Sequence, residues 1–226
     1  MTSRSWPGGF TEHSARTVDG VRVRLWQGSD VSDADVRVSP ADAVRAMETF
    51  ADWYGRYPYP EVDVVTGQYP WGSMEYPTLV AAVPGPGVAV THELAHQWWY
   101  ALVGNNQYAD PWLDEAFTHC SALRLTGEEV GIDCADPPWQ PGDCLTNGLD
   151  YYAAHGGSGF VVIYLIGSCM LFDLEQTLGG DRMLAMLRHY AVEQRFGIST
   201  PEEFRAAAQA VSPVDLAPFW TKWRAA

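Results

Sequence analysis

The chain has 226 residues, of which 47% are hydrophobic and 19% are charged, a balance typical of a globular protein and not of a disordered one. Its formal net charge of −14 argues against a nucleic-acid partner, because such a partner requires a basic surface. No transmembrane segment is expected, since Gly167, Ser168 and Asp173 interrupt the apolar stretch 161–174 before it reaches the length of a membrane span.

The first half of the chain predicts short strands and one helix. Residues 18–26 alternate apolar and polar side chains, as a half-buried strand does. Ser39-Pro40 is a typical helix start, and the helical periodicity of 41–54 ends at Gly55. The remaining predicted features of this half are a strand over 62–66, strand-like character towards the end of 71–83, and a tight Pro-Gly connection at 84–87.

The second half predicts mainly helices. An apolar stretch over 88–103 is long enough for a buried helix, which Gly104-Asn-Asn106 ends. Asp110-Pro111 begins a further helix over 111–127. Residues 131–148 are rich in Pro, Gly and Asp, so they predict a long irregular loop at the rim of a cleft. The final part, 158–226, is helical, with a capping box at Thr200 and breaks at 179–180 and 212–213. Strands followed by helices predict an α+β fold, with a small mixed sheet and then a mostly helical half.

Four cysteines are too few to define a disulfide scaffold. Cys134 and Cys144 bracket part of the irregular loop, so a disulfide between them is expected. Cys120 and Cys169 lie in predicted helices and either pair or stay as buried thiols. A structural zinc site built on these cysteines is disfavoured, because no C-x-x-C spacing is present. A Cys134–Cys144 disulfide would favour an exported or extracellular protein, and its absence a cytoplasmic one.

The segment His92-Glu93-Leu94-Ala95-His96 is an H-E-x-x-H motif within the apolar stretch. Histidines at i and i+4 project from the same face of a helix, so both imidazoles can reach one zinc ion. Glu93 stands where a carboxylate can take a proton from water at the metal. An accidental match would leave these polar groups buried without a compensating partner, which is costly.

Glu115 lies 19 positions after the second histidine, in the next predicted helix. A catalytic zinc usually has three protein ligands and one open position, and two histidines with one glutamate form such a set. The spacing therefore predicts one zinc ion per chain, bound by His92, His96 and Glu115.

Four ordered motifs together resemble the gluzincin zinc aminopeptidases, the family of the alanyl (membrane) aminopeptidases and leukotriene hydrolase. They are Gly72-Ser-Met-Glu-Tyr76, the zinc motif with Glu115 in Trp112-Leu-Asp-Glu-Ala-Phe117, Tyr164-Leu-Ile-Gly167, and the distal pair Ser199-Thr-Pro-Glu-Glu-Phe204 and Asp215-Leu-Ala-Pro-Phe-Trp220. The resemblance covers the chain from about residue 40 to its end. It implies a thermolysin-like catalytic domain over 31–226, preceded by residues 1–30 as a remnant of, or linker from, an N-terminal β-domain.

The resemblance implies catalytic roles for two residues. Glu93 would be the general base and acid, and Tyr164 would donate a hydrogen bond to the developing oxyanion. Tyr164 could instead be a core aromatic residue, because its surroundings in the sequence are strongly apolar. Gly167, three residues later, favours Tyr164 over the competing tyrosines at positions 151, 152 and 190.

The resemblance also implies a substrate-binding strand. Glu75 would bind the free α-amino group of a peptide, while Gly72, Met74 and Tyr76 would lie along the substrate. The simpler alternative is an ordinary strand-entry turn with a solvent-facing glutamate. Tyr76 departs from the family pattern, which has asparagine at this place, and Pro77 follows it.

Two further residues near the third ligand stand out. Asp114 replaces the usual asparagine before Glu115 and adds a negative charge beside the site. His119 lies four residues after Glu115 and either supports the metal ligands or is an ordinary helix histidine.

These observations predict a zinc aminopeptidase acting on peptides with a free amino terminus. Two alternatives stay open. A metalloendopeptidase is possible if amine recognition depends on an N-terminal β-domain that is missing here. A catalytically silent peptide-binding module of the same fold is the other, although neither a ligand nor the base has been lost.

Overall fold

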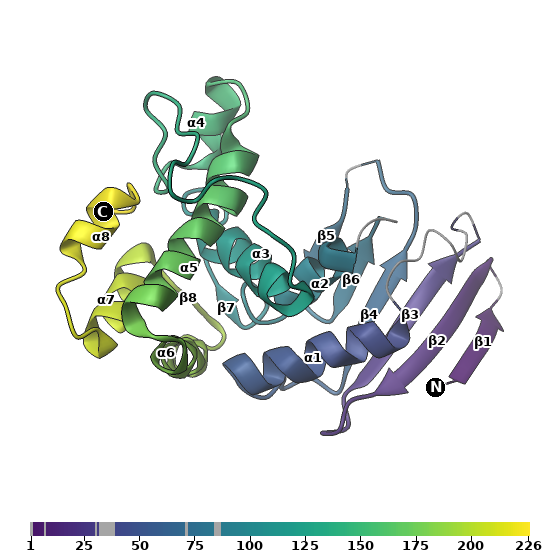
Figure 1. Cartoon of the computed structure of the whole chain (residues 1–226). Helices are drawn as coiled ribbons and strands as arrows, with labels where there is room; N and C mark the ends of the chain where they lie inside the picture. Colours follow the sequence, from purple (N-terminus) through teal and green to yellow (C-terminus); the bar gives the residue numbers. More distant parts are fainter. Residues whose placement is uncertain (1, 7, 30, 32–38, 71, 84–86) are drawn as a thin grey trace. The chain divides into compact units, whose positions relative to one another are not determined.

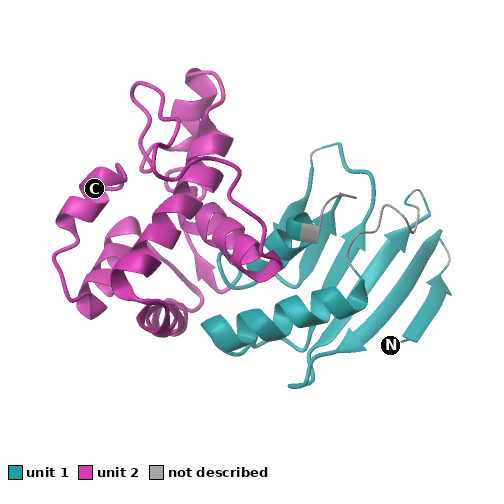
Figure 2. Ribbon diagram, viewed as in Figure 1, with its two compact units in different colours: residues 1–101 teal, residues 102–226 magenta. Residues whose placement is uncertain are grey.

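The computed structural model describes residues 2–6, 8–29, 31, 39–70, 72–83 and 87–226. The chain divides into two compact units, residues 1–101 and residues 102–226 (Figure 2). The division predicted from the sequence, at residue 30, differs from this one because residues 2–28 form three strands of the same sheet as residues 61–82.

Unit 1 is built on a six-stranded mixed sheet with the order β1-β2-β3-β4-β6-β5 (Figure 1). The strands are β1 (Thr2–Trp6), β2 (Phe10–Arg16), β3 (Arg22–Gly28), β4 (Glu61–Thr66), β5 (Met74–Tyr76) and β6 (Leu79–Ala82). The pairs β3–β4 and β4–β6 are parallel, and the other pairs are antiparallel. The small β5 is therefore an edge strand of this sheet.

One face of the sheet is buried. Alternation along β3 and β4 turns Val23, Leu25, Val62 and Val64 to the interior, where each is at most 2% exposed. Two helices belong to this unit, α1 (Pro40–Tyr54) and α2 (Gly87–Ala95). The helix α1 packs against β2, β3 and α2 (Figure 1).

The helix α1 forms where the sequence predicts it. The Ser39 side chain accepts a hydrogen bond from the backbone of Asp42, and the Asp42 carboxylate accepts one from the backbone of Ser39, which completes a capping box. Gly55 follows the helix at a φ of 103°, a conformation that favours glycine. The predicted strand 62–66 is also confirmed, as β4.

The predicted strand 18–26 is wrong in its first part. A turn over 18–21 separates β2 from β3, and Arg16 hydrogen-bonds the carbonyl of Gly20 across it. The polar strands β1 and β2 carry little apolar alternation, so the sequence pattern did not reveal them. Of the predicted connection 84–87, residues 84–86 lie outside the described residues.

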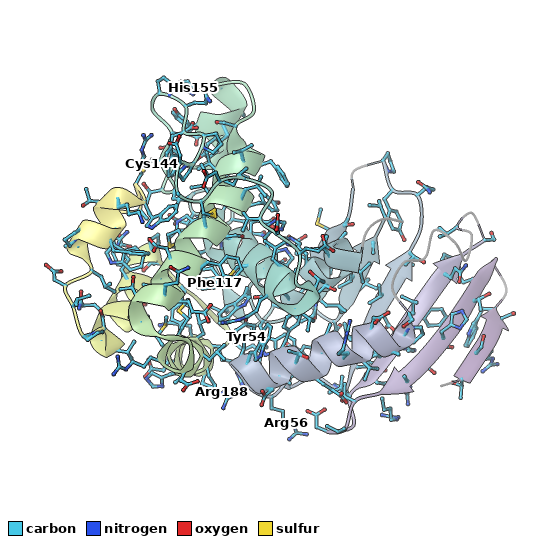
Figure 3. The ribbon with its side chains drawn as sticks, viewed as in Figure 1. Tyr54, Arg56, Phe117, Cys144, His155 and Arg188 are labelled. Atoms are coloured by element: carbon cyan, nitrogen blue, oxygen red, sulfur yellow. A yellow bond between two sulfur atoms is a disulfide. The ribbon has the colours of Figure 1, made fainter. Side chains whose placement is uncertain are left out.

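Unit 2 is mostly helical. Its elements are α3 (Trp112–Thr126), α4 (Leu149–Ala154), a π-helix η1 (Val161–Ile166), α5 (Gly167–Leu178), α6 (Gly180–Glu193), α7 (Pro201–Val211), α8 (Ala217–Lys222), and the short parallel strands β7 (Val103–Gly104) and β8 (Gly197–Ile198). Phe204 is completely buried and its ring contacts four other aromatic rings, including that of Phe117 at a centroid distance of 4.8 Å (Figure 3). Residues 131–148 contain no helix or strand, as predicted.

One described helical stretch, Val161–Leu178, is long and apolar enough by composition alone to cross a membrane, although the sequence had predicted none. More than half of this stretch, 56%, is buried within the structure, as is usual for the core helix of a folded domain.

The predicted Cys134–Cys144 disulfide is wrong. Cys134 is bonded to Cys169 of α5, with the two Cα atoms 5.3 Å apart. The Cys144 thiol instead donates a hydrogen bond to the carbonyl of Arg224, 80 positions along the chain (Figure 3). Cys120 is also a free thiol. Closeness in sequence did not decide the pairing, because the fold brings a helix cysteine to the loop.

We expect the Cys134→Ser variant to lose about 3–4 kcal/mol of unfolding free energy in unit 2, because the disulfide closes a loop with a sequence separation of 35. Cys144→Ser is the matched control, since it removes a thiol outside the cross-link. Denaturant unfolding under non-reducing conditions measures both. Peptide mapping that recovered Cys134 joined to Cys144 would contradict the assignment.

Candidate metal centre

The helix that carries the zinc motif is shorter than predicted. It begins at Gly87 and ends at Ala95, and turns replace the helix predicted up to residue 103. The backbone N–H of His96 still donates to the carbonyl of His92, at 3.3 Å, so the two histidines keep their one-turn relationship. The helix does not continue to residue 103, because Tyr100 has a φ of 130°, far from the helical region. The Trp98 side chain lies within unit 1, where its indole N–H donates to the carbonyl of Gly55 at 2.8 Å.

The two histidines direct nitrogen atoms at the same point. Their Nε2 atoms are 3.1 Å apart, and their ring planes are inclined at 84°. Two nitrogens bound to one tetrahedral zinc at about 2.0–2.1 Å would be about 3.3 Å apart, so the observed separation fits a shared metal ion. Both side chains are buried, His96 at 1% exposure.

The Nδ1 atom of His96 is 3.0 Å from the backbone carbonyl oxygen of Trp99. A carbonyl only accepts hydrogen bonds, so Nδ1 carries the proton and the lone pair of Nε2 is left to face a metal. This contact is the usual outer support of a histidine ligand, and it fixes both the tautomer and the ring orientation.

Two carboxylates lie beside the histidines. Glu93 follows His92 on α2 and is buried, at 8% exposure. Glu75 comes from the edge strand β5, and its carboxylate, that of Glu93 and a ring nitrogen of His96 lie within 4.8 Å of one another. Two carboxylates at this distance repel each other, so the cluster favours the binding of a cation, either a metal ion or an ammonium group.

The other predicted substrate-binding residues surround Glu75 on the same segment. Met74 and Tyr76 pair with Ala81 and Leu79 of β6, and the Tyr76 side chain is 49% exposed. Gly72 precedes the strand at a φ of 88°, and no atom lies within 4 Å of the position that a Cβ would occupy. The backbone conformation, and not crowding, explains the glycine.

The sequence alone predicted no role for Gln97, the residue after the second histidine. Its side chain is completely buried and makes hydrogen bonds to three residues, at Tyr57, Tyr76 and Thr78. Burial raises the pKa of the Tyr57 phenol, which therefore stays protonated and donates to the Gln97 side-chain oxygen at 2.9 Å. The one signal in the sequence is that Gln97 directly follows the H-E-x-x-H motif; its burial and its contacts are visible only in the fold.

In unit 2, Glu115 lies in the first turn of α3 and is partly exposed. The preceding Asp114 is buried, and its carboxylate accepts hydrogen bonds from the backbone of Glu115 at 2.9 Å and from the side chain of Gln107 at 2.8 Å. The extra charge predicted at this position is thus held by the N-terminus of the helix, where a carboxylate is favourable.

Tyr164 lies in the π-helix η1 and is partly exposed. Its ring centroid is 6.0 Å from that of His119 and 4.9 Å from that of Phe160. Single π-helical turns are rare in proteins overall, but those that occur are frequently found at functional sites. Of the competing tyrosines, Tyr152 donates to the carbonyl of Cys144, and Tyr190 pairs with Ser199 in the interior of unit 2.

Gly167 follows the π-helix and allows close packing. A Cβ built on Gly167 would lie 2.5 Å from the Cβ of Ala116, the residue after Glu115. The start of α5 therefore approaches α3 as closely as a glycine permits. This contact holds the segment with Tyr164 against the helix that carries Glu115 and His119.

The irregular loop lines a cavity of unit 2 of about 610 Å³. Its walls come from the loop, from α4 and the residues after it, and from the first residue of η1, among them Gln140, Asp143, Tyr151, His155 and Val161. The rings of Tyr151 and His155 stack at a centroid distance of 4.2 Å (His155 is labelled in Figure 3). The long loop is thus part of a hollow in the same unit as Tyr164.

No protein-family model matches the chain. Among curated proteins, aminopeptidase N of Lactobacillus helveticus is 24% identical over 96% of the chain, and leukotriene A-4 hydrolase of Xenopus laevis is 25% identical over 82% of it. The chain spans only about a third of these proteins, 30% and 35% of their lengths.

Among solved structures, the M1 zinc metallopeptidase of Deinococcus radiodurans matches 99% of this chain with a TM-score of 0.78 and 17% sequence identity. The match covers 59% of the metallopeptidase chain. The mixed sheet followed by a helical half is therefore a fold shared with this part of the M1 metallopeptidase.

We expect Gly167→Ala to lower the unfolding free energy by about 1–3 kcal/mol, because the added methyl group clashes with Ala116. Ala116→Gly removes the clashing atom, so the double variant should be more stable than the sum of the two single effects predicts. Thermal or denaturant unfolding measures the four proteins. Strictly additive losses would show that this contact does not limit the packing.

Proposed function

We propose that this chain, which is related to the gluzincin zinc aminopeptidases, is a zinc metallopeptidase domain that removes the N-terminal residue from peptides. The observation that carries the proposal is the pair of buried imidazole nitrogens 3.1 Å apart, beside the carboxylates of Glu75 and Glu93. The assignment as a thermolysin-like catalytic domain belongs to the same proposal.

His92, His96 and Glu115 would hold one zinc ion. The first two direct their Nε2 atoms at one point in unit 1. Glu115 is assigned from its spacing and from its motif in the first turn of α3. When bound, zinc supplies a Lewis acid that polarises the scissile carbonyl and lowers the pKa of a water molecule.

Glu93 would move the proton. It is a buried carboxylate on α2, next to His92 and three residues before His96, so it can accept the proton of the attacking water. The same carboxyl group would then donate this proton to the leaving amine. The hydroxyl of Tyr164 would donate a hydrogen bond to the carbonyl oxygen of the scissile bond as negative charge develops on that oxygen.

Glu75 would make the enzyme an exopeptidase. Its carboxylate can pair with the ammonium of a free amino terminus, which an internal peptide bond lacks. The edge position of β5 supports this role, because an extended peptide can lie along an edge strand; Gly72, Met74 and Tyr76 belong to this segment. The net charge of −14 is compatible with a positively charged substrate group.

We expect Glu93→Gln to bind zinc as the wild type does and to lose about 10²–10⁴-fold in turnover, because the amide cannot accept the proton of water. Zinc content by atomic spectroscopy and hydrolysis of amino-acid arylamides measure the two properties. His96→Ala is the matched variant that should lose the metal. Full activity of Glu93→Gln would rule out the proposed mechanism, and a wild type with zinc but no peptide hydrolysis would favour a binding module.

We expect Glu75→Ala to raise KM for peptides with a free amino terminus by about 10–100-fold, because a charge-assisted hydrogen bond is lost. The same peptides with an acetylated amino terminus should be poor substrates of both proteins. Efficient cleavage of acetylated peptides, with Glu75→Ala unimpaired, would identify a metalloendopeptidase instead.

A further inference from the structure

The turn between β5 and β6 is held by a side chain from outside the sheet. The Gln97 amide N–H donates to the carbonyl of Tyr76 at 3.0 Å, and its side-chain oxygen accepts from the backbone N–H of Thr78 at 2.8 Å. The Gln97 amide thus bonds the residue before the two-residue turn and the second residue of the turn. Gln97 is completely buried, so water does not compete for these bonds.

The same turn contains a strained residue. Thr78 has a φ of 65°, in the left-handed region, which is an outlier for a β-branched side chain. Its carbonyl accepts a hydrogen bond from the backbone of Asp63 at 2.9 Å, and its N–H is bound by Gln97. Such a conformation persists only where the surroundings determine it on several sides, and it occurs most often at functional sites.

The turn begins two residues after Glu75, the residue assigned to amine binding. β5 has only three residues and lies at the edge of the sheet, so the turn that follows it contributes to the position of the strand. The Glu75 carboxylate lies within 4.8 Å of Glu93 and His96, although carboxylates repel each other at this distance. A bond that pulls the end of β5 onto the segment after α2 opposes this repulsion.

We infer that Gln97 is a positioning residue for Glu75: it ties the strand of the amine-binding carboxylate to the chain segment that carries His96. The inference rests on the proposed function. Tyr57 completes the arrangement, because its hydroxyl donates to the same side-chain oxygen and so supports the amide orientation in which the oxygen bonds Thr78 and the nitrogen bonds Tyr76.

The test uses Gln97→Met, which keeps a similar volume but has neither donor nor acceptor. Tyr57→Phe is the matched control, because it removes one bond of the same amide and leaves both bonds to the turn. Zinc content and circular dichroism first establish that each variant is folded and loaded with metal. If Gln97→Met does not fold, Gln97→Glu replaces it, since this variant keeps the acceptor for Thr78 and loses the donor to Tyr76.

The first readout needs no substrate. Amide hydrogen exchange at Thr78 should become at least about 10-fold faster in Gln97→Met than in the wild type, and change less in Tyr57→Phe. The second readout is the ratio of dissociation constants for an amino-acid hydroxamate and its analogue without the α-amino group. We expect this ratio to fall by about 10-fold in Gln97→Met, with the affinity for the amine-free compound nearly unchanged.

A double-mutant cycle completes the experiment. If Gln97 acts through Glu75, then Gln97→Met should have little further effect on the ratio in the Glu75→Ala background. Unchanged exchange at Thr78, or a wild-type ratio in folded Gln97→Met, would overturn the inference while the proposed function stands. A wild type that does not distinguish the two hydroxamates would contradict the proposed amine recognition itself.

Discussion

The arrangement of unit 1 depends on one electrostatic constraint. The imidazoles of His92 and His96 are buried, with their Nε2 atoms 3.1 Å apart. The carboxylates of Glu75 and Glu93 lie within 4.8 Å of each other and of a ring nitrogen of His96. Such a cluster is costly in a medium of low dielectric constant unless a cation is bound, since polar and charged groups lose their hydration there. The structure around it explains how the groups are kept together: His96 is fixed through the carbonyl of Trp99, and the β5 turn through the amide of Gln97.

The sheet supplies the foundation for this cluster. The buried residues of β3 and β4 fix the position of β6, and among the described strands β6 alone pairs with β5. After α2 the backbone N–H groups of Gln97, Trp98 and Trp99 still bond locally, to the carbonyls of Leu94 and Ala95. The side chains of Gln97 and Trp98 are therefore available to bond the backbone of Tyr76 and Gly55. These side-chain bonds fasten the segment after His96 to the rest of unit 1.

Local signals in the sequence were sufficient to predict several elements and the closeness of the two histidines. The capping boxes at Ser39 and Thr200 mark the starts of α1 and α7, because they depend only on residues three positions apart. The i, i+4 spacing of the histidines encodes their shared face in the same way. The sequence missed what long-range contacts decide: the early end of α2, the polar strands β1 and β2, and the pairing of Cys134 with Cys169.

Gln97 shows why a sequence motif is easier to predict than the residues that hold its surroundings in place. His92, Glu93 and His96 lie within five consecutive residues, so their relative positions can be predicted from the local sequence. The contacts of Gln97 reach back 21 positions to Tyr76 and 40 to Tyr57. They exist only after the sheet has formed and α2 has packed on it. Candidate metal ligands can therefore be predicted from a pattern, whereas a residue that holds the Glu75 carboxylate in place emerges only from the folded backbone.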